Sequence, residues 1–227
     1  MSKQSGTGNN IITPIAYDVF GRQVKEYLPY TTTSSSGLNY ESNALVDVLN
    51  FPYYAGQNPF SEKKLEFSPL NRVLQQGAPG TDWAIGSGHE VKLDYKTNTD
   101  IEVKNYSVNA IWSAALGLDT ISLTDNGNYI LNQLYKTITY DENTAAIPLE
   151  TAGSTVEFKN KEGQVVLKRT YNAGVKHDTY YVYDAYGNLT YVLPPLVDAK
   201  LAVTVDILNG LCYQYKYDHR NRLVEKK

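Results

Sequence analysis

Three histidines, His89, His177 and His219, are the first residues in this sequence whose side chains suit acid–base or metal chemistry. Histidine titrates near neutral pH and serves widely as a general base and as a metal ligand. No second His, Cys or carboxylate stands at metal-ligand spacing from any of them. We therefore interpret all three as surface or turn residues, and we expect no metal and no cofactor.

Serine and carboxylate chemistry is equally poorly supported. Ser87 lies between two glycines, but the full Gly-x-Ser-x-Gly pattern of a nucleophile elbow is missing. The acidic residues Asp141, Glu142, Glu157 and Glu162 include pairs that a glycosidase would need about 5 to 9 Å apart. Turn and solvated-strand roles are commoner for such residues. A polysaccharide-acting enzyme is therefore the least favoured hypothesis, and we expect no catalytic residues.

The segment Asp125-Asn126-Gly127-Asn128 resembles the start of a calcium-binding loop. It lacks the glutamate that such a loop carries at its twelfth position. Asn-Gly between two runs of strand-forming residues is instead a strong signal for a hairpin turn. The sequence predicts a turn here, leading into a strand that starts at Tyr129.

Aromatic residues are a further source of binding chemistry, because the chain contains 20 Tyr beside 5 Phe and 2 Trp. Exposed aromatic rings stack on sugars, whereas rings packed between strands do not bind ligands. A carbohydrate- or cell-surface-binding β-module is therefore our alternative function, and it depends on exposure. The candidates for glycan stacking are Trp83, Trp112, Tyr180, Tyr181, Tyr186 and Tyr191.

Composition limits the classes of protein and partner. The 227 residues carry a formal net charge of −3, which argues against a nucleic-acid binder that relies on bulk positive charge. The hydrophobic share of 42% is enough for a core, and no apolar run approaches the roughly 18 residues of a membrane helix. The single cysteine, Cys212, excludes an internal disulfide and a cysteine-based zinc site. We expect neither nucleic acid nor membrane insertion.

The elements that position these residues repeat along the chain. The segment Tyr17–Val24 matches Tyr183–Thr190 and Tyr217–Val224, and two weaker copies are Phe67–Leu74 and Phe158–Val165, the last with one extra residue before its glycine. In each copy an aromatic residue ends one strand, a short polar residue starts a turn, and Gly or Asn supplies a positive φ. The turn residues are Tyr17, Asp18, Gly21, Arg22, Phe67, Asn71, Arg72, Gly163, Tyr183, Asp184, Gly187, Asn188, Tyr217, Asp218, Asn221 and Arg222.

Alternation with a period of two flanks these turns, as at Tyr181 and Tyr183, and it favours strands over helices. The predicted fold is all-β: an irregular stack of antiparallel β-hairpins that forms a curved ribbon, with one or two short helices. One helix is predicted within Ser42–Asn50, with Ser42 or Asn43 as its cap. A strand is predicted over Ile101–Trp112, and Val197–Leu208 fits a helix or a strand.

The Tyr-Asp segments resemble the YD repeats of the bacterial Rhs family, to which the teneurin shell is related, and the resemblance extends from Ile12 onward. It implies a β-ribbon that spirals into a hollow shell, which in many members encloses a C-terminal toxin or effector. The sequence has no Asp-Pro dipeptide of the kind found in self-cleaving members, so autoproteolysis is not carried over.

The domain hypothesis has a flexible tail at residues 1–11 and a repeat ribbon at 12–227. Five repeat units are too few to close a shell, so we expect a fragment of a larger protein. The resemblance implies a non-catalytic wall module whose partners are the remaining repeats and an enclosed effector. It also implies a secreted or cell-surface location, although residues 1–10 contain no secretory signal. Unpaired strand edges favour edge-to-edge self-association.

Overall fold

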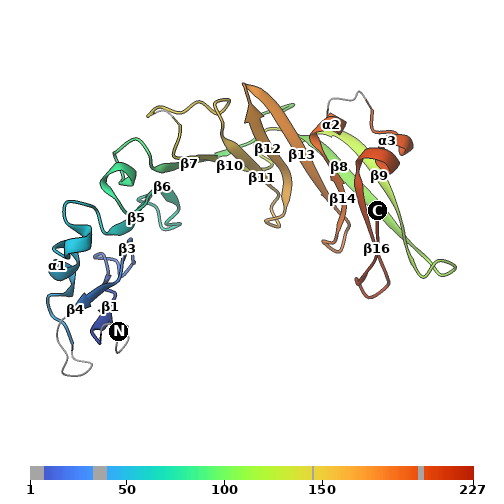
Figure 1. Cartoon of the computed structure of the whole chain (residues 1–227). Coiled ribbons are helices and arrows are strands. Elements are labelled where there is room, and N and C mark those ends of the chain that lie inside the picture. The colour runs from blue at the N-terminus through green and yellow to red at the C-terminus, as the bar shows by residue number, and fades with distance from the viewer. Residues whose placement is uncertain (1–7, 33–39, 145, 199–201) are drawn as a thin grey trace. The chain divides into compact units, whose positions relative to one another are not determined.

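The computed structural model describes residues 8–32, 40–144, 146–198 and 202–227 (Figure 1). The chain divides into two compact units: unit 1 is Met1–Leu93 with Tyr140–Pro148, and unit 2 is Asp94–Thr139 with Leu149–Lys227. Strands account for 44% of the residues and helices for 11%, and the strand pairs are antiparallel. The predicted all-β class is confirmed. No helix in the described ranges is long and apolar enough to span a bilayer.

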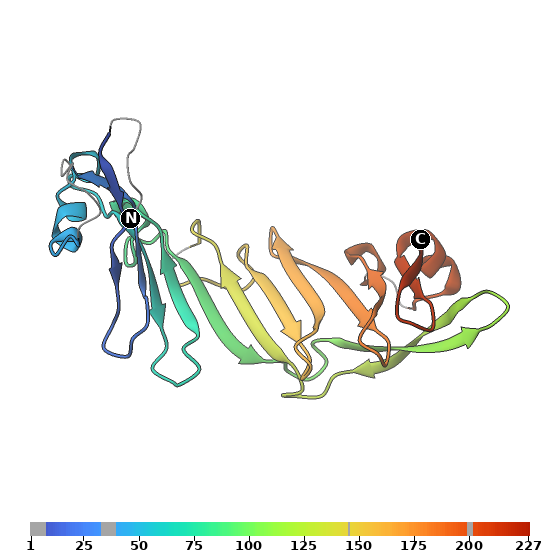
Figure 2. The ribbon, with the colours of Figure 1, turned by 90° about the horizontal axis from the view of Figure 1, so that it is seen from below.

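The main sheet of unit 1 has the strand order β7-β6-β5-β3-β2, and β1 pairs separately with β4. The β2–β3 and β5–β6 turns lie side by side at the same end of the strands (Figure 2). The strands of unit 1 are β1 (Asn10–Ile12), β2 (Ile15–Ala16), β3 (Lys25–Tyr27), β4 (Tyr30–Thr32), β5 (Phe60–Leu65), β6 (Val73–Gly77) and the first residues of β7 (Val91–Thr97).

A small core in unit 1 holds the β1–β4 pair against helix α1 (Ala44–Leu49). Ile12, Tyr30 and Val48 are buried there. The predicted helix is confirmed, with Asn43 at its N-cap, but the Asn43 side chain makes no capping hydrogen bond. Two 3₁₀ turns, Pro52–Tyr54 and Thr81–Trp83, complete the helical structure of this unit in the described residues.

The predicted tail at residues 1–11 is wrong at its C-terminal end. Asn10 pairs with Thr32 and Ile11 with Thr31, because pairing β1 with β4 lets Ile12 and Tyr30 bury their side chains together. A Gly- and Asn-rich composition suggested a loose segment, but the strand partner lies 20 residues away in sequence and no local pattern reveals it. Residues 1–7 lie outside the described residues.

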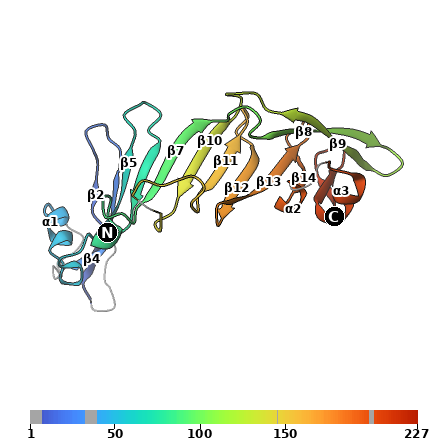
Figure 3. The same cartoon turned by 90° about the horizontal axis from the view of Figure 1, so that it is seen from above.

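Unit 2 contains a meander of seven antiparallel strands in sequence order, from β10 to β16. A separate long hairpin, β8–β9, extends beside β13 and β14 (Figure 3). The strands are β8 (Lys104–Ser113), β9 (Leu118–Asn128), β10 (Tyr135–Tyr140), β11 (Thr155–Lys159), β12 (Val165–Asn172), β13 (Val175–Tyr183), β14 (Leu189–Leu193), β15 (Tyr213–Tyr217) and β16 (Leu223–Lys226).

The core of unit 2 is a row of cross-strand neighbours on one face of this sheet. Phe158 pairs with Leu167, Leu167 with Tyr180, and Tyr180 with Leu193, and all four side chains are buried. The β8–β9 hairpin covers the row: Tyr106 meets Tyr180 edge to face, with ring centroids 5.3 Å apart. Burial of such aromatic and aliphatic side chains is the main force that holds the hairpin on the sheet.

Two helices follow β14. Helix α2 (Pro195–Asp198) begins directly after the strand, and helix α3 (Val205–Leu211) is capped by Thr204, whose Oγ1 accepts a hydrogen bond from the Ile207 amide. The segment Val197–Leu208 is therefore helical at both ends, while residues 199–201 lie outside the described residues. The described ranges contain three short α-helices, one more than the upper number predicted.

The predicted hairpin turn at Asp125–Asn128 is wrong, because β9 continues through it. The Asp125 carboxylate accepts a hydrogen bond from the Gly127 amide, and Gly127 has a φ of 88°. The register shifts opposite these residues, which marks a β-bulge. A bulge and a tight turn need the same residue types, and here the strand is long enough to absorb the bulge. The β8–β9 turn instead spans residues 114–117 and ends at Gly117, which has a φ of 67°.

The predicted strand Ile101–Trp112 also starts too early. Ile101 has a φ of 62°, which a β-branched residue does not adopt in a regular strand, and β8 begins at Lys104.

Candidate functional site

The Asp184 turn shows how a Tyr-Asp repeat closes. The Asp184 Oδ1 atom accepts hydrogen bonds from the amides of Tyr186 and Asn188, each at 2.9 Å. Its Oδ2 atom accepts a third from Asn188 Nδ2 at 2.9 Å. The Asp184 amide donates to the Asn188 carbonyl at 3.0 Å, which joins the two strands. A single carboxylate therefore organises the whole five-residue turn.

The Asp18 and Asp218 turns have the same arrangement, with Arg in place of Asn188. Asp18 Oδ1 accepts from the amides two and four residues later at 2.9 Å, and Asp218 Oδ1 does so at 2.9 and 3.0 Å. The Nε atom of Arg22 or Arg222 donates to Oδ2 at 2.7 or 2.8 Å. These hydrogen bonds lower the pKa of Asp18 and hold the pKa of Asp218 at about 2.

The residue three places after each aspartate has a positive φ. The values are 73° at Gly21, 84° at Gly187 and 57° at Asn221. The predicted conformation of Gly187 is confirmed. Asn221 shows why asparagine can replace glycine, since it tolerates the left-handed region better than other side chains.

The weaker copy at Phe158 is aligned one residue later than its sequence suggested. Asn160 takes the place of the aspartate: its Oδ1 atom accepts from the Gln164 amide at 2.9 Å, and its Nδ2 atom donates to Gln164 Oε1 at 2.8 Å. Gly163 follows three places later with a φ of 81°, so the turn has no extra residue. Matching Phe158 to tyrosine hid Asn160. The spacing Asn-x-x-Gly-Gln would have revealed it.

The copy at Phe67 is the least regular. Phe67 is fully exposed, and the carboxylate comes from Glu66, which accepts from Arg72 Nε at 2.9 Å and pairs with Arg72 Nη2 at 2.7 Å. Asn71 has a φ of 51°. Bonds from the Arg72 and Ser68 side chains lower the pKa of Glu66 to about 2. The role of Glu66 does not follow from the Tyr-Asp pattern, because its longer side chain lets the acid stand six residues before Arg72.

The tyrosine of each Tyr-Asp pair in unit 2 contacts the preceding hairpin. Tyr183 Oη donates to the Val165 carbonyl at 3.1 Å, and Tyr217 Oη donates to the Leu189 carbonyl at 2.9 Å. In both cases the acceptor is the first residue of the strand that follows the previous turn. The turns also touch each other, since Asn188 Nδ2 donates to Asn221 Oδ1 at 3.1 Å. Each repeat is thus bound to its neighbour through side chains as well as strand pairing.

Two of the six residues expected to stack on glycans are buried. Tyr180 is 3% exposed and Tyr191 is 2% exposed, so the prediction is wrong for both. The β8–β9 hairpin covers them, and Tyr191 Oη donates to the Ile121 carbonyl at 3.2 Å. Trp83, Trp112 and Tyr186 are exposed, and Tyr181 is half-buried.

His89, His219, Ser87 and Asp141 lie in surface loops and turns. His177 instead lies half-buried in strand β13, opposite Thr170, and Glu157 lies in strand β11. His89 is exposed against Trp83, and His219 lies in the Asp218 turn against Trp112. Ser87 Oγ accepts from the His89 amide, and Asp141 Oδ1 accepts from the Asn143 amide, as turn residues do. Within the described ranges, no group of three or more His, Cys, Asp or Glu side chains is placed to hold a metal ion.

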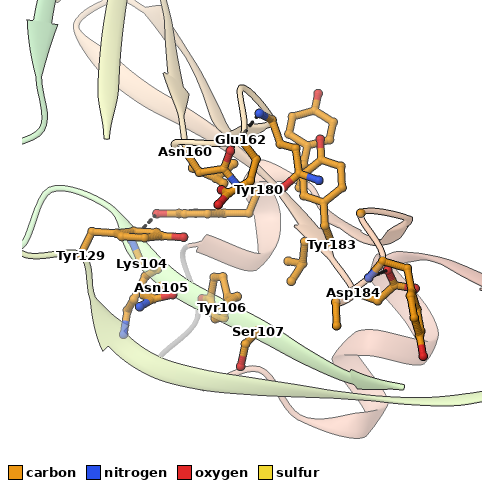
Figure 4. Close-up of a pocket in the computed structure, with 17 residues that line it drawn as sticks. Lys104, Asn105, Tyr106, Ser107, Tyr129, Asn160, Glu162, Tyr180, Tyr183 and Asp184 are labelled. Atoms are coloured by element: carbon orange, nitrogen blue, oxygen red, sulfur yellow. Dashed lines mark hydrogen bonds between the residues drawn. The ribbon is translucent and has the colours of Figure 1, made fainter. Parts of the chain in front are cut away.

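A pocket of about 550 Å³ lies within unit 2 (Figure 4). Its walls are the start of β8 (Lys104–Ser107), Tyr129, the β11–β12 turn and the end of β13 with its turn. Figure 4 shows Tyr129, Tyr180 and Glu162, from three separate segments, close together at one end. Burial and the negative charge of Glu162 raise the pKa of Tyr129, so its hydroxyl stays protonated.

The comparison with known families covers the N-terminal part of the chain. Residues 1–97 match the family described as a domain of unknown function, DUF6443. This segment contains the Asp18 and Phe67 turns and nearly coincides with the N-terminal stretch of unit 1. No curated protein matches the chain.

The carboxylates of the repeat turns, in the DUF6443 segment and beyond it, are thus occupied by hydrogen bonds within their own turns. Such groups stabilise chain reversals and are poorly placed to act as acids or bases. The pocket differs, because several of its polar side chains face open space.

Proposed function

We propose that this chain is a non-catalytic structural repeat module that forms part of the wall of an Rhs-type shell, which encloses or displays a C-terminal toxin or effector. The observation that carries the proposal is the tyrosine contact between repeats. Tyr183 and Tyr217 each bind the first carbonyl after the preceding turn. A wall has to keep successive hairpins in register, and these bonds fix that register.

The chemistry of the repeat residues supports the same role. Asp18, Asp184 and Asp218 satisfy backbone amides within their own turns. A scaffold needs only this kind of internal satisfaction, together with continuous strand pairing.

The proposed partners and location rest on the resemblance of the Tyr-Asp segments to YD repeats. They are the other repeats of the parent protein, an enclosed effector, and a secreted or cell-surface setting. The module acts without nucleic acid and without inserting into a membrane.

Limited proteolysis of the protein translated from the complete gene tests this role. We expect the segment that follows the repeats to resist trypsin. The double variant Tyr183→Phe/Tyr217→Phe removes two hydrogen bonds of about 0.5–1.5 kcal/mol each, so cleavage of that segment should accelerate at least about fivefold. Tyr213→Phe is the matched control, because Tyr213 lies in β15 and is 53% exposed.

The proposal is overturned if the gene encodes nothing beyond the repeats, or if the following segment is digested as fast in the parent protein as when it is free. Equal protection in the double variant and in the control would remove the tyrosine contact as its support.

A further inference from the structure

Four polar side chains of the unit 2 pocket have no hydrogen-bond partner among the described residues: Asn105, Tyr129, Glu162 and Tyr181. Polar side chains that converge on a cavity without internal partners are typical of a binding site.

The frame around these groups is fixed. Asn160 and Gln164 bind each other, and Tyr183 binds the Val165 carbonyl. Tyr106 and Tyr180 are held edge to face, with an interplanar angle of 90°. A ligand would therefore meet a preformed site and would not have to order it, which favours binding.

The charges of the pocket disfavour an anionic ligand. The Lys104 ammonium is paired with Asp125 at 3.1 Å, while the Glu162 carboxylate carries no ion pair among the described residues. A phosphate, nucleotide or acidic sugar would be repelled by the Glu162 carboxylate, and the described lining residues offer it no cation other than the paired Lys104.

The uncommitted groups suit hydroxyls. The Asn105 amide both donates and accepts, the Glu162 carboxylate accepts, and the protonated Tyr129 hydroxyl does both. Neighbouring hydroxyls on a sugar need this mixture. The half-buried Tyr129 ring adds an apolar face. An organic cation would favour several ring faces around one point, but Tyr106 and Tyr180 are packed against each other.

We propose that this pocket binds a neutral saccharide, with Tyr129 as the stacking ring and Asn105 and Glu162 as the hydroxyl-binding groups. The volume of about 550 Å³ lies within the range of roughly 300–1,000 Å³ found for small-molecule sites. The proposal is separate from the wall role, because none of these three side chains takes part in the turn or tyrosine contacts between repeats.

A glycan array of neutral and acidic saccharides, followed by calorimetric titration of the hits, tests the site. We expect a neutral saccharide to bind. Tyr129→Ala should weaken that binding at least about tenfold. It removes both the ring on which the sugar stacks and the hydroxyl that hydrogen-bonds it, and a loss of about 1.4 kcal/mol in binding free energy raises the Kd tenfold. Glu162→Gln, an exposed and nearly isosteric change, should weaken it several-fold without lowering the melting temperature.

Tyr213→Ala is the matched control, because it removes an exposed tyrosine outside the pocket. Choline chloride and inorganic phosphate are titrated in parallel. The proposal is overturned if no saccharide on the array binds, if binding survives both pocket variants, or if choline or phosphate binds instead with the same sensitivity to Glu162→Gln. Thermal melts show whether Tyr129→Ala folds, and Glu162→Gln keeps the test decisive if it does not.

Discussion

The side-chain atom that closes each repeat turn is an oxygen acceptor, and its charge is secondary. Asn160 organises its turn through Oδ1 at 2.9 Å, as the three aspartates do, without a negative charge. The carboxylate adds an ion pair where the fifth residue is arginine, as between Asp218 and Arg222 at 2.6 Å. The two contributions can therefore be separated by experiment.

Asp218→Asn should keep the turn and remove its dependence on pH. The pKa of Asp218 is about 2, below the usual value of about 4, because Arg222 donates to the carboxylate. A lowered pKa means that its stabilising contribution is present above about pH 4 and is lost as the pH falls toward 2. Urea unfolding at pH 7 and pH 2.5 should show that the free energy of unfolding falls less in the variant than in the parent protein. An equal decrease in both proteins would show that protonation of Asp218 does not cause the loss of stability at low pH.

Gly187→Val should destabilise unit 2 by roughly 1–3 kcal/mol. The φ of 84° is strained for any β-branched residue, and a Cβ atom at this position would lie 3.2 Å from Gln164 Nε2. Gly210→Val is the control, since Gly210 lies in α3 with open space around it, and its effect should stay within about 0.5 kcal/mol. Thermal melts compare the two variants. Equal melting temperatures would count against the strained turn.

Positions whose conformation depends on nearby residues could be predicted from the sequence. Gly187 needs only its turn, and its positive φ follows from the Tyr-Asp-x-x-Gly pattern. The burial of Tyr180 and Tyr191 depends on a hairpin more than 50 residues away, as the bond between Tyr191 and Ile121 shows. The pocket was missed for the same reason, because Asn105, Tyr129 and Glu162 meet only after β8–β9 folds against the sheet.

Strands β12 and β13 are joined by a buried ion pair as well as by backbone bonds. Arg169 donates to Asp178 from Nε at 2.6 Å and from Nη2 at 2.8 Å, and the side chains are 6% and 0% exposed. Arg169 Nη2 also donates to the Glu102 carbonyl at 3.2 Å, which ties the segment before β8 to the sheet. The pair lies in the same row as Ile138 and Val156.

Asp178→Ala should cost about 3–5 kcal/mol, because it removes both short bonds to the buried Arg169 guanidinium and leaves Glu102 Oε1, 3.5 Å away, as its carboxylate contact. Glu26→Ala, which breaks the exposed pair with Lys63, should cost less than about 1 kcal/mol. Denaturant unfolding measures both. The double variant Arg169→Met/Asp178→Leu should recover most of the loss. A single-variant cost no larger than that of Glu26→Ala would show that the buried pair is dispensable.

Elements were predicted correctly where their pattern was unambiguous. The helix within Ser42–Asn50 and the hairpins around the Tyr-Asp turns follow from capping residues and alternation. Asp125–Asn128 failed because an Asx contact with a following positive-φ glycine fits a bulge and a turn equally well. Strand length, which the local pattern does not encode, decides between them.

At the scale of the whole molecule, strand β16 forms an open edge of the unit 2 sheet. It pairs with β15 alone in the part of the chain that the structure describes. Val224 on this strand is 52% exposed. Exposed edges with apolar side chains pair with other chains unless a charge or a covering element prevents it.

We therefore predict concentration-dependent self-association, measured by sedimentation velocity. Val224→Lys should reduce self-association, because pairing of a second chain with β16 would then bury the lysine ammonium. Val205→Lys, at a 70% exposed position on α3, should leave it unchanged. A monomer at all concentrations would exclude the edge as an association surface.

The tyrosine contacts tolerate very different chain lengths between repeats. Tyr183 reaches a carbonyl 18 residues earlier, whereas Tyr217 reaches one 28 residues earlier, with α2 and α3 in between. The side of the sheet opposite the Tyr-Asp turns is therefore free to vary in length. The connection between β14 and β15 should therefore tolerate an inserted peptide, whether natural or engineered, without disturbing the stacking of the hairpins.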